Sequence, residues 1–477
     1  MFPSTGLCET HFLEVALPCM TLIKSISGFR GTIGGKVGDN LTPLDTVKFA
    51  AAFATWLKQQ NAGKTVVIGR DARISGSMIS NLVSNTLIGM GMDVIDLGLS
   101  TTPTVEMAVP ALNASAGIIL TASHNPAQWN ALKLLNSKGE FISAEDGKAL
   151  LEIADGDDVE FAEVTELGKI TNMDGWIEKH IDLILACEEV DVVAIKNANF
   201  KVVVDGVNST GGIAIPAILR RLGVSQTTEL YCEPNGEFPH NPEPLAENLT
   251  KISEVVRTEK ADLGIVVDPD VDRLCFVMEN GDMFGEEYTL VAVSDYLLGL
   301  QPGNTVSNLS STRALRDVTE KHGGKYEASV VGEVNVVNKM KEINAVIGGE
   351  GNGGVIWPKL HYGRDALAGV ALFLSHLAHK KTSMTALKAE YPLYEMSKNK
   401  IELKPHMNIP DILSKMGEKY ANENTNTIDG LKIEFAEEWV HLRGSNTEPI
   451  IRIYAESKSA QKAHDLTEKI KAEVLAL

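Results

Sequence analysis

The chain has 477 residues, a formal net charge of −19, 44% hydrophobic residues and 22% charged residues. This length exceeds what one ordinary hydrophobic core supports, so we expect two to four domains. The negative charge argues against nucleic acid or an anionic membrane surface as a partner, and no apolar run approaches the roughly 20 residues that span a bilayer.

The N-terminal segment lacks the basic start of a secretory signal peptide, because the first Lys or Arg is Lys24. Met20 is a candidate natural start, which would make residues 1–19 an upstream extension. The five cysteines show no paired or metal-ligand spacing, which indicates a reducing compartment and no disulfide framework. We therefore expect a cytoplasmic protein.

Apolar runs that alternate with helical patterns predict an α/β organisation. Continuous apolar strands that end in glycine-rich or polar loops are predicted at 64–73, 115–126, 201–212, 263–273 and 344–354. Helical patterns lie between them, as at 44–60 and 366–379. Continuous apolar strands are typical of largely parallel sheets that are covered on both faces. In such sheets the loops after the carboxyl ends of the strands bind ligands.

Three breaks along the chain predict four domains. The stretch 152–168 carries seven acids and no base, which is typical of a solvated connector. An Asn-Gly turn near residue 280 and the segment 390–400 give two further breaks. After residue 400 two strands and a terminal helix indicate a smaller α+β domain. After the extension at 1–19 we therefore place domains at 20–165, 166–282, 283–390 and 391–477.

The loop after the strand at 115–126 carries a hydroxyl and basic side chains. Ser123 and His124 lie in TASHNP, and Lys133 follows ten positions after the serine. A lone serine or histidine there is more often a cap or a structural residue, because serine is a weak nucleophile unless a base or a cation activates it. Lys133 could act as an acid or base if desolvation and neighbouring cations lower its pKa.

The segment DPDVDR at 268–273 places Asp268, Asp270 and Asp272 in alternation, so an extended backbone would point all three carboxylates to one side. Three converging carboxylates repel one another unless a cation joins them, and hard oxygen ligands on a short loop suit Mg²⁺. An EF-hand is excluded, because Arg273 stands where its loop needs glycine and the flanks are strand-like. An acidic surface turn is the alternative.

Two later loops carry groups that could hold a phosphorylated sugar. Glu350 and Asn352 in GGEGNGG suit neighbouring sugar hydroxyls, although a flexible turn would explain them as well. Guanidinium groups, hydroxyls and turn amides in RGSNTEPIIR suit a phosphate, and the candidates are Arg443, Ser445, Asn446, Thr447 and Arg452. The glycines in 27–38 do not fit the dinucleotide pattern G-x-G-x-x-G.

Together these loops supply the parts of a phosphoryl transfer, which needs positioning and charge neutralisation above all. They offer a hydroxyl that can carry phosphate, a divalent cation, an acid or base, a sugar site and a distant phosphate site. Two other classes remain open. An aspartyl-phosphate phosphatase could use Asp268 and Asp270, and a sugar-phosphate-binding protein would need no catalysis.

The motifs TASHNP, DPDVDR, GEGNGG and RGSNTEP resemble, in this order, the four signature loops of the α-D-phosphohexomutases, and the resemblance covers the chain from Met20 onward. It implies three related α/β domains with mixed, largely parallel sheets and a C-terminal α+β domain around a central cleft. It also implies a hexose or hexosamine phosphate substrate and a sugar bisphosphate that serves as intermediate and activator.

The same resemblance implies roles for individual residues. Ser123 would be the phosphoserine, and the three aspartates of DPDVDR would bind Mg²⁺ together with a phosphoserine oxygen. Lys133 would be the general acid or base, with Arg30 and His124 lining the site. Ala131 stands where many members have glycine, which changes the surroundings of Lys133.

The resemblance also implies how the substrate is held. Arg273 would contact the serine phosphate, Glu350 and Asn352 would bind sugar hydroxyls, and the residues at 443–452 would hold the other phosphate. The loop GEGNGGVIWP is most similar to archaeal-type phosphoglucosamine mutases. We therefore expect interconversion of glucosamine 6-phosphate and glucosamine 1-phosphate, with glucose and mannose phosphates as alternatives, because one pocket need not separate an amine from a hydroxyl strongly.

Overall fold

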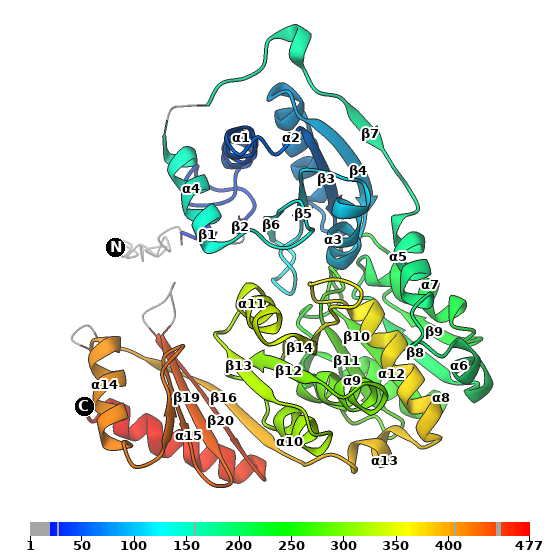
Figure 1. The fold of residues 1–477 in the computed structure, drawn as a ribbon, viewed down its shortest axis with the longest axis vertical. Helices are drawn as coiled ribbons and strands as arrows, with labels where there is room; N and C mark the ends of the chain where they lie inside the picture. Colours follow the sequence, from blue (N-terminus) through cyan, green and yellow to red (C-terminus); the bar gives the residue numbers. More distant parts are fainter. Residues whose placement is uncertain (1–19, 26–27, 157–158, 405–406, 445–449) are drawn as a thin grey trace, which may run out of the picture.

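The computed structural model of the protein describes residues 20–25, 28–156, 159–404, 407–444 and 450–477, so the extension predicted at 1–19 lies outside the described residues. Four sheets with flanking helices follow one another along the chain (Figure 1). No helix in the described ranges is both long and apolar enough to cross a bilayer. This arrangement confirms the predicted four-domain α/β class.

Domain 1 has a seven-stranded mixed sheet in the order β1-β2-β6-β5-β3-β4-β7. Its strands are β1 (Ile23–Ser25), β2 (Gly28–Thr32), β3 (Thr65–Arg70), β4 (Asp93–Leu99), β5 (Ala116–Leu120), β6 (Trp129–Leu135) and β7 (Ile170–Asn172). Its helices are α1 (Pro43–Gln59), α2 (Gly76–Gly89), α3 (Thr102–Ala111) and α4 (Ala144–Asp155), followed by a 3₁₀ turn at Val164–Glu166. Because β7 pairs with β4, the first sheet continues past the boundary that we placed at residue 165.

Local sequence explains where the first helix begins. Thr42 accepts the backbone N–H of Asp45, and the Asp45 carboxylate accepts the backbone N–H of Thr42, which is a complete capping box. Pro43 occupies the first turn, where its missing N–H costs nothing. The helix predicted at 44–60 is therefore confirmed almost to the residue.

Domain 2 contains a four-stranded sheet in the order β11-β10-β8-β9. Its strands are β8 (Lys201–Asp205), β9 (Gln226–Leu230), β10 (Leu263–Val267) and β11 (Leu274–Met278). Its helices are α5 (Trp176–Leu185), α6 (Val192–Ala198), α7 (Gly211–Arg221) and α8 (Thr250–Glu259), with a 3₁₀ turn at Ala246–Asn248.

Domain 3 repeats this plan with the strand order β13-β12-β14-β15. Its strands are β12 (Asn304–Asn308), β13 (Tyr326–Ser329), β14 (Ala345–Glu350) and β15 (Gly354–Ile356). Its helices are α9 (Glu286–Leu300), α10 (Ala314–Lys321), α11 (Glu333–Ile343), α12 (Ala366–Lys380) and α13 (Met384–Lys388).

The three α/β domains share one topology, as predicted. In each, a central strand is parallel to two neighbours, and one of those neighbours continues through a hairpin into an antiparallel strand. The hairpin loops are β5–β6, β10–β11 and β14–β15, and they carry TASHNP, DPDVDR and GEGNGG respectively. Three motifs that lie far apart in the sequence therefore occupy the same position in three related units.

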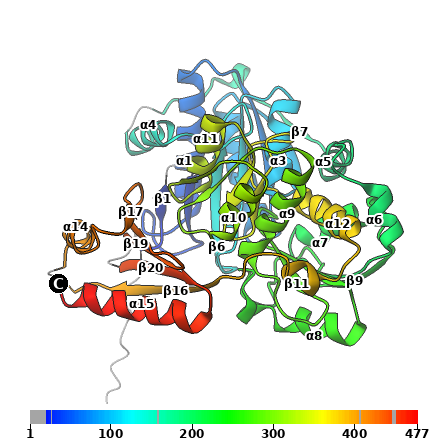
Figure 2. The same ribbon diagram turned by 60° about the horizontal axis from the view of Figure 1, so that its bottom comes forward.

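Domain 4 has a five-stranded antiparallel sheet in the order β16-β20-β19-β18-β17, which confirms the predicted α+β unit. The strands are β16 (Glu395–Glu402), β17 (Asn424–Asn426), β18 (Leu431–Glu434), β19 (Trp439–Gly444) and β20 (Ile450–Ser457). The helices are α14 (Ile409–Lys419) and α15 (Ala460–Leu475). This domain lies at one side of the molecule (Figure 2).

Domains 2 and 3 share a large hydrophobic core. Domain 4 has its own core, and domain 1 has two clusters, one of which includes Trp176 of α5. Helix α12 joins domains 2 and 3, because it packs on α5, α6 and α7 of domain 2 and on α9 of domain 3. Its Phe373 ring stacks on Phe276 with the centroids 3.9 Å apart and meets Phe284 edge-on at 5.4 Å. The two domains therefore form one packing unit.

Replacing the shared ring tests this packing. We expect Phe373→Ala to lower the free energy of unfolding by about 3–5 kcal/mol, because it removes a fully buried ring and leaves a cavity. Denaturant titration measures the loss, and Leu393→Ala, at a side chain 55% exposed, serves as the control. Hydrogen exchange should show weaker protection in both domains. Loosening of only one domain would contradict a shared core.

Candidate active site

The structure places Ser123 beside the three aspartates of the DPDVDR loop. The Ser123 hydroxyl donates a 2.7 Å hydrogen bond to Oδ2 of Asp268, although 145 positions separate the two residues. Asp268, Asp270 and Asp272 are buried, and a carboxylate oxygen from each lies within 4.8 Å of the others. A hydroxyl from domain 1 and an acidic cluster from domain 2 thus form one site.

The loop that carries Ser123 is held by a buried arginine that the sequence analysis missed. Ser123 has φ +49°, a left-handed conformation that costs a residue with a Cβ about 1–2 kcal/mol. Arg73 donates to the carbonyl oxygens of Ser123 at 2.5 Å and Asn125 at 2.7 Å, while its Nε donates to Asp71 at 2.9 Å. These charge-assisted bonds fix the serine in its strained conformation. Arg73 lies 50 positions before Ser123 in the sequence, so only the structure shows that it holds this loop.

The aspartates converge through a tight turn, so the extended segment that we expected from their alternation is wrong. Val271 adopts φ +63°, which is unusual for a β-branched residue. Oδ1 of Asp268 accepts the backbone N–H groups of Asp272 at 3.2 Å and Arg273 at 3.1 Å. The first aspartate therefore folds the loop back over itself and brings the other two beside it.

Two cations from other domains balance the acidic cluster. Lys133 Nζ lies 2.6 Å from Asp270 Oδ2 and 3.2 Å from Asp272 Oδ2. Arg364 Nη2 lies 2.7 Å from the same Asp272 oxygen. Lys133 stands on β6, opposite Gly28 of β2 and Ile119 of β5, and not in the loop that precedes it. The sequence analysis missed both this strand and Arg364.

The pKa of Lys133, which the sequence could not give, is raised. Burial acts to lower this pKa, but the Asp270 and Asp272 carboxylates raise it by more. The pKa of Asp272 lies below its usual range: burial would raise it, but Arg364 and Lys133 outweigh that effect. Burial and repulsion from Asp272 and Asp270 raise the pKa of Asp268 well above its ordinary value.

The acidic cluster fits a magnesium ion. Oδ1 of Asp270 and Oδ1 of Asp272 are buried and have no hydrogen-bond partner among the described residues. Buried carboxylate oxygens without partners are costly, and a hard cation satisfies them. Thr102 donates to Oδ2 of Asp270 at 2.5 Å, which leaves the other oxygen of that carboxylate for a ligand. Carboxylate oxygens are ligands that suit hard divalent cations, Mg²⁺ among them.

His124, next to Ser123, lies near two arginines. His124 Nδ1 lies 3.4 Å from Ser123 Oγ, and burial together with Arg273 lowers the pKa of His124 to about 2, so its ring is neutral. Burial and then the nearby Arg273 charge also lower the pKa of Arg30. Arg30 donates to Asn125 Oδ1 at 3.1 Å, and Arg273 lies 3.3 Å from Glu243. Two neighbouring guanidinium groups of this kind could hold an anion.

The proposed sugar loop reaches the acidic cluster through Arg364. Glu350 is buried: its Oε1 accepts Asn308 at 2.9 Å and the Gly332 N–H at 3.1 Å, and its Oε2 lies 3.1 Å from Arg364 Nη1. Asn352 is half-buried and its Oδ1 accepts the Gly354 N–H at 3.2 Å. Because Arg364 bonds Asp272 and Glu350 at once, it joins the loops of domains 2 and 3.

The phosphate loop of domain 4 is described only in part, because Ser445, Asn446 and Thr447 lie outside the described residues. Arg443 and Arg452 stand opposite each other on β19 and β20. Arg443 Nε lies 3.1 Å from Asp429 of the same domain, and Arg452 is exposed. Within the described ranges, neither arginine bonds to the Ser123 and aspartate cluster.

Magnesium should stabilise the fold through the acidic cluster. At about 100 times its Kd, Mg²⁺ that binds only the folded chain adds about 2.7 kcal/mol to the free energy of unfolding. We expect the thermal midpoint of the wild type to rise with Mg²⁺ and to fall back with a chelator. Asp270→Asn should lose most of this rise. An equal rise in both proteins would place the stabilising ion elsewhere.

Four family models of phosphoglucomutase/phosphomannomutase match the chain in succession. They are the α/β/α domains I, II and III and the C-terminal domain, and they match residues 23–160, 178–281, 285–394 and 398–473. The matches follow the order of the four sheets.

Relatives match over nearly the whole chain. A phosphoglucomutase/phosphomannomutase of Thermococcus kodakarensis is 35% identical and the match covers 92% of this chain and 96% of that protein. A phosphoglucosamine/phosphogalactosamine mutase of Sulfurisphaera tokodaii is 32% identical, with 92% and 98% covered. The fold also matches the crystal structure of a phosphoglucomutase/phosphomannomutase family protein from Burkholderia thailandensis, with a TM-score of 0.81 at 23% identity and 96% and 98% covered. The chain therefore belongs to the phosphoglucomutase/phosphomannomutase family of phosphohexomutases.

Proposed function

We propose that this chain is a phosphoglucosamine mutase that interconverts glucosamine 6-phosphate and glucosamine 1-phosphate. One observation carries the proposal: the Ser123 hydroxyl lies 2.7 Å from a buried aspartate of a cluster that fits Mg²⁺. A hydroxyl in this position can carry a phosphate whose charge the surrounding cations neutralise. The reaction then moves a phosphate from serine to sugar and another from sugar back to serine.

Each half of the reaction breaks one phosphorus–oxygen bond and forms another. The bond between Ser123 Oγ and phosphorus breaks as a free sugar hydroxyl attacks, and the hydroxyl proton leaves to a base. The product is a sugar bisphosphate, which reorients in the site so that its other phosphate faces Ser123. Attack by Ser123 Oγ on its other phosphate then restores the serine phosphate and releases the isomer. Bound Mg²⁺ would neutralise charge on the transferring phosphate.

The chain's own residues divide the remaining work. We assign Lys133, which carries its proton, as the donor to the oxygen that leaves, and the deprotonated amine would take a proton back in the return half. Arg30 and Arg273 would hold phosphate oxygens near Ser123. His124 is neutral, so it can accept a hydrogen bond from the serine hydroxyl but carries no charge at neutral pH.

An aspartyl-phosphate mechanism is disfavoured because Asp268 is engaged through both oxygens, while the free oxygen of Asp270 is one that would hold the metal ion. Asp268 accepts hydrogen bonds from the Ser123 hydroxyl and from two backbone N–H groups, which occupy both of its oxygens. Asp270 is bound by Lys133 and Thr102 through one oxygen. The serine is the group whose oxygen is held beside the acidic cluster and the basic residues at once.

The choice of glucosamine rests on the sugar loop and on the names of relatives. Glu350 uses three of its roughly four acceptor positions on protein donors, which leaves one for a ligand. An ammonium group at the sugar suits a carboxylate better than a hydroxyl does. The Sulfurisphaera relative is named for hexosamine phosphates. The Thermococcus relative is named for glucose and mannose phosphates, which are therefore the second candidates.

Ser123→Ala should abolish mutase turnover by several orders of magnitude, because it removes the oxygen that accepts and donates the phosphate. Binding of glucosamine 6-phosphate should remain measurable by calorimetry, since the sugar and distal phosphate sites are untouched. Ser77→Ala, at an exposed serine of α2 in the same domain, is the control. Turnover of the Ser123 variant at the wild-type rate would end the serine assignment.

A substrate comparison tests the choice of sugar. We expect kcat/KM for glucosamine 6-phosphate to exceed the values for glucose and mannose 6-phosphates, by a factor within roughly 10- to 200-fold, which is what one group in a pocket can supply. Coupled assays of the three sugars on one preparation give the ratio. A preference for the glucose or mannose phosphate would keep the mechanism and overturn the substrate.

A further inference from the structure

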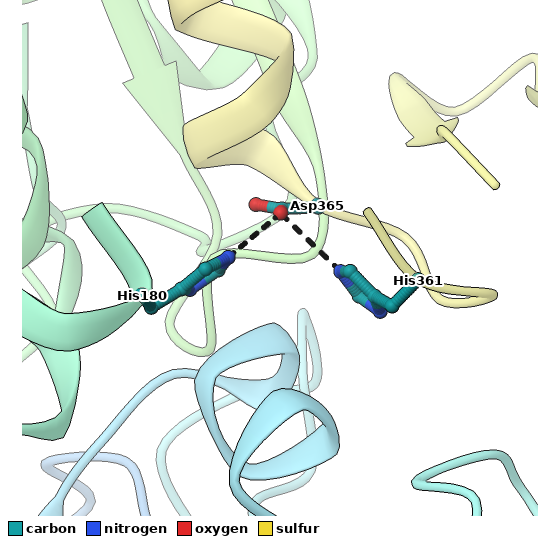
Figure 3. Close-up of side chains that lie close together, drawn as sticks. All are labelled: His180, His361 and Asp365. Carbon is teal, nitrogen blue, oxygen red and sulfur yellow. Dashed lines mark hydrogen bonds and ion pairs between the residues drawn. The ribbon is translucent and has the colours of Figure 1, made fainter. Parts of the chain in front are cut away.

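Two histidines and an aspartate meet at the junction of domains 1, 2 and 3. His180 comes from α5, His361 from the loop between β15 and α12, and Asp365 from the N-cap of α12 (Figure 3). Both imidazole rings point their Nε2 atoms at Oδ2 of Asp365, at 3.0 Å for His180 and 3.3 Å for His361. Helix α3 of domain 1 closes the other side through Thr104 and Glu106.

The three inward atoms are spaced like the ligands of one metal ion. Each of His180, His361 and Asp365 offers a candidate ligand atom within 4.8 Å of those of the other two, and both Nε2 atoms lie close to Oδ2 of Asp365. Two ligand atoms that each lie about 2.0–2.1 Å from a tetrahedral Zn²⁺ are about 3.3 Å apart. His180 and Asp365 are fully buried and the side chain of His361 is 11% exposed. The cluster therefore has both the spacing and the seclusion of a coordination site.

The outer nitrogens of both rings face oxygen atoms. His180 Nδ1 lies 3.1 Å from Thr104 Oγ1, and His361 Nδ1 lies 3.4 Å from Glu106 Oε2. Metal-binding histidines usually donate the second N–H to a carboxylate, carbonyl or hydroxyl, which fixes the tautomer that leaves Nε2 free. Oδ1 of Asp365 accepts the N–H groups of Leu367 and Ala368, which orients Oδ2 toward the rings.

The surroundings of Glu106 indicate independently that a positive charge or a hydrogen-bond donor is missing beside its carboxylate. Its side chain is 1% exposed, and neither oxygen has a hydrogen-bond partner among the described residues, nor does Nδ1 of His361. The chain makes room for this carboxylate: a Cβ at Gly363 would lie 1.9 Å from Glu106 Oε2. A buried carboxylate without a donor is costly, and an Nδ1–H on a metal-bound His361 would supply that donor.

We propose that His180, His361 and Asp365 bind a divalent transition-metal ion, Zn²⁺ by preference, with Glu106 and Thr104 as the partners of the two histidines. Two imidazoles and one carboxylate suit Zn²⁺, whereas the all-carboxylate cluster of DPDVDR suits Mg²⁺. Three protein ligands leave one position for water. The chain thus separates two metal sites by the chemistry of their ligands.

The site joins the three α/β domains next to the proposed catalytic cluster. Its ligand Asp365 follows Arg364, which contacts Asp272 and Glu350. Helix α5 of domain 2 and the α12 N-terminus of domain 3 are ligand-bearing, and α3 of domain 1 supplies the outer contacts. A bound ion would therefore fix the position of Arg364 without touching the substrate.

The alternative is a chain of hydrogen bonds without an ion. In that arrangement both histidines donate Nε2–H to Asp365, and a protonated Glu106 donates to Nδ1 of His361. Burial, and then repulsion from Glu333, raises the pKa of Glu106 well above its ordinary value, which permits the protonated form. Only the metal-ion arrangement predicts binding of Zn²⁺, so direct measurement separates the two.

The test measures Zn²⁺ binding to the full chain after treatment with a chelator. Equilibrium dialysis is performed with Zn²⁺ alone as the probe, in excess Mg²⁺ so that the carboxylate cluster is filled. We expect one tightly bound Zn²⁺ in the wild type and in Asp270→Asn, and its loss in both His180→Gln and His361→Gln. Glu106→Gln should bind roughly 10- to 100-fold more weakly. His379→Gln, at an exposed histidine paired with Asp191 outside the cluster, is the matched control.

Thermal midpoints give a second reading on the same proteins. Zn²⁺ should raise the midpoint of the wild type and of His379→Gln, and should leave that of His361→Gln unchanged. Absence of tight Zn²⁺ binding to the wild type would overturn the proposal in favour of the hydrogen-bonded chain. Equal binding by the wild type and both ligand variants, or loss of Zn²⁺ from Asp270→Asn alone, would overturn it as well.

Discussion

Three carboxylates buried in one short loop are the constraint around which this molecule is organised. Asp268, Asp270 and Asp272 are almost inaccessible to water, and a buried charge is tolerated only where opposite charge or hydrogen-bond donors compensate it. The compensation comes from other domains: Lys133 from domain 1 and Arg364 from domain 3. The acidic loop therefore links the three α/β domains. Asp268 of this loop also accepts the Ser123 hydroxyl.

The repeated topology explains how residues so distant in sequence meet. In each α/β domain a motif loop lies in the hairpin between a strand next to the central strand and its antiparallel partner. When three such units face one another, the three hairpins converge, as the bonds from Ser123 to Asp268 and from Arg364 to Asp272 and Glu350 show. The shared core of domains 2 and 3 places two of these loops on one packing unit, and domain 1 contributes the serine.

The sequence revealed what local patterns encode and missed what arises between domains. The continuous apolar strands, the long helices, and two strands and the terminal helix after residue 400 were predictable, because burial and helical periodicity shape the sequence of each segment. The other three strands of the C-terminal sheet were not predicted. Ser123 and the three aspartates could be named as candidate site residues from their residue types and from their positions in loops after predicted strands. Lys133 was assigned to a loop, and the direction of its pKa shift could not be predicted, because its strand and its carboxylate partners are set by tertiary pairing. Arg73 and Arg364 carry no local pattern, so only contacts in space identify them.

The net charge of −19 opposes the binding of an anion, so cations within the site have to compensate for it. A field of that sign opposes an anionic substrate at a distance, so the cations that receive it must be close together and partly shielded. Arg30 and Arg273 are candidates for this role, and burial, then the Arg273 charge, lowers the pKa of Arg30. Asn125 and Glu243 each occupy one of these guanidinium groups. A phosphate would relieve the repulsion between the two arginines, whereas a neutral sugar would not, so the arrangement selects for charge before it selects for the sugar.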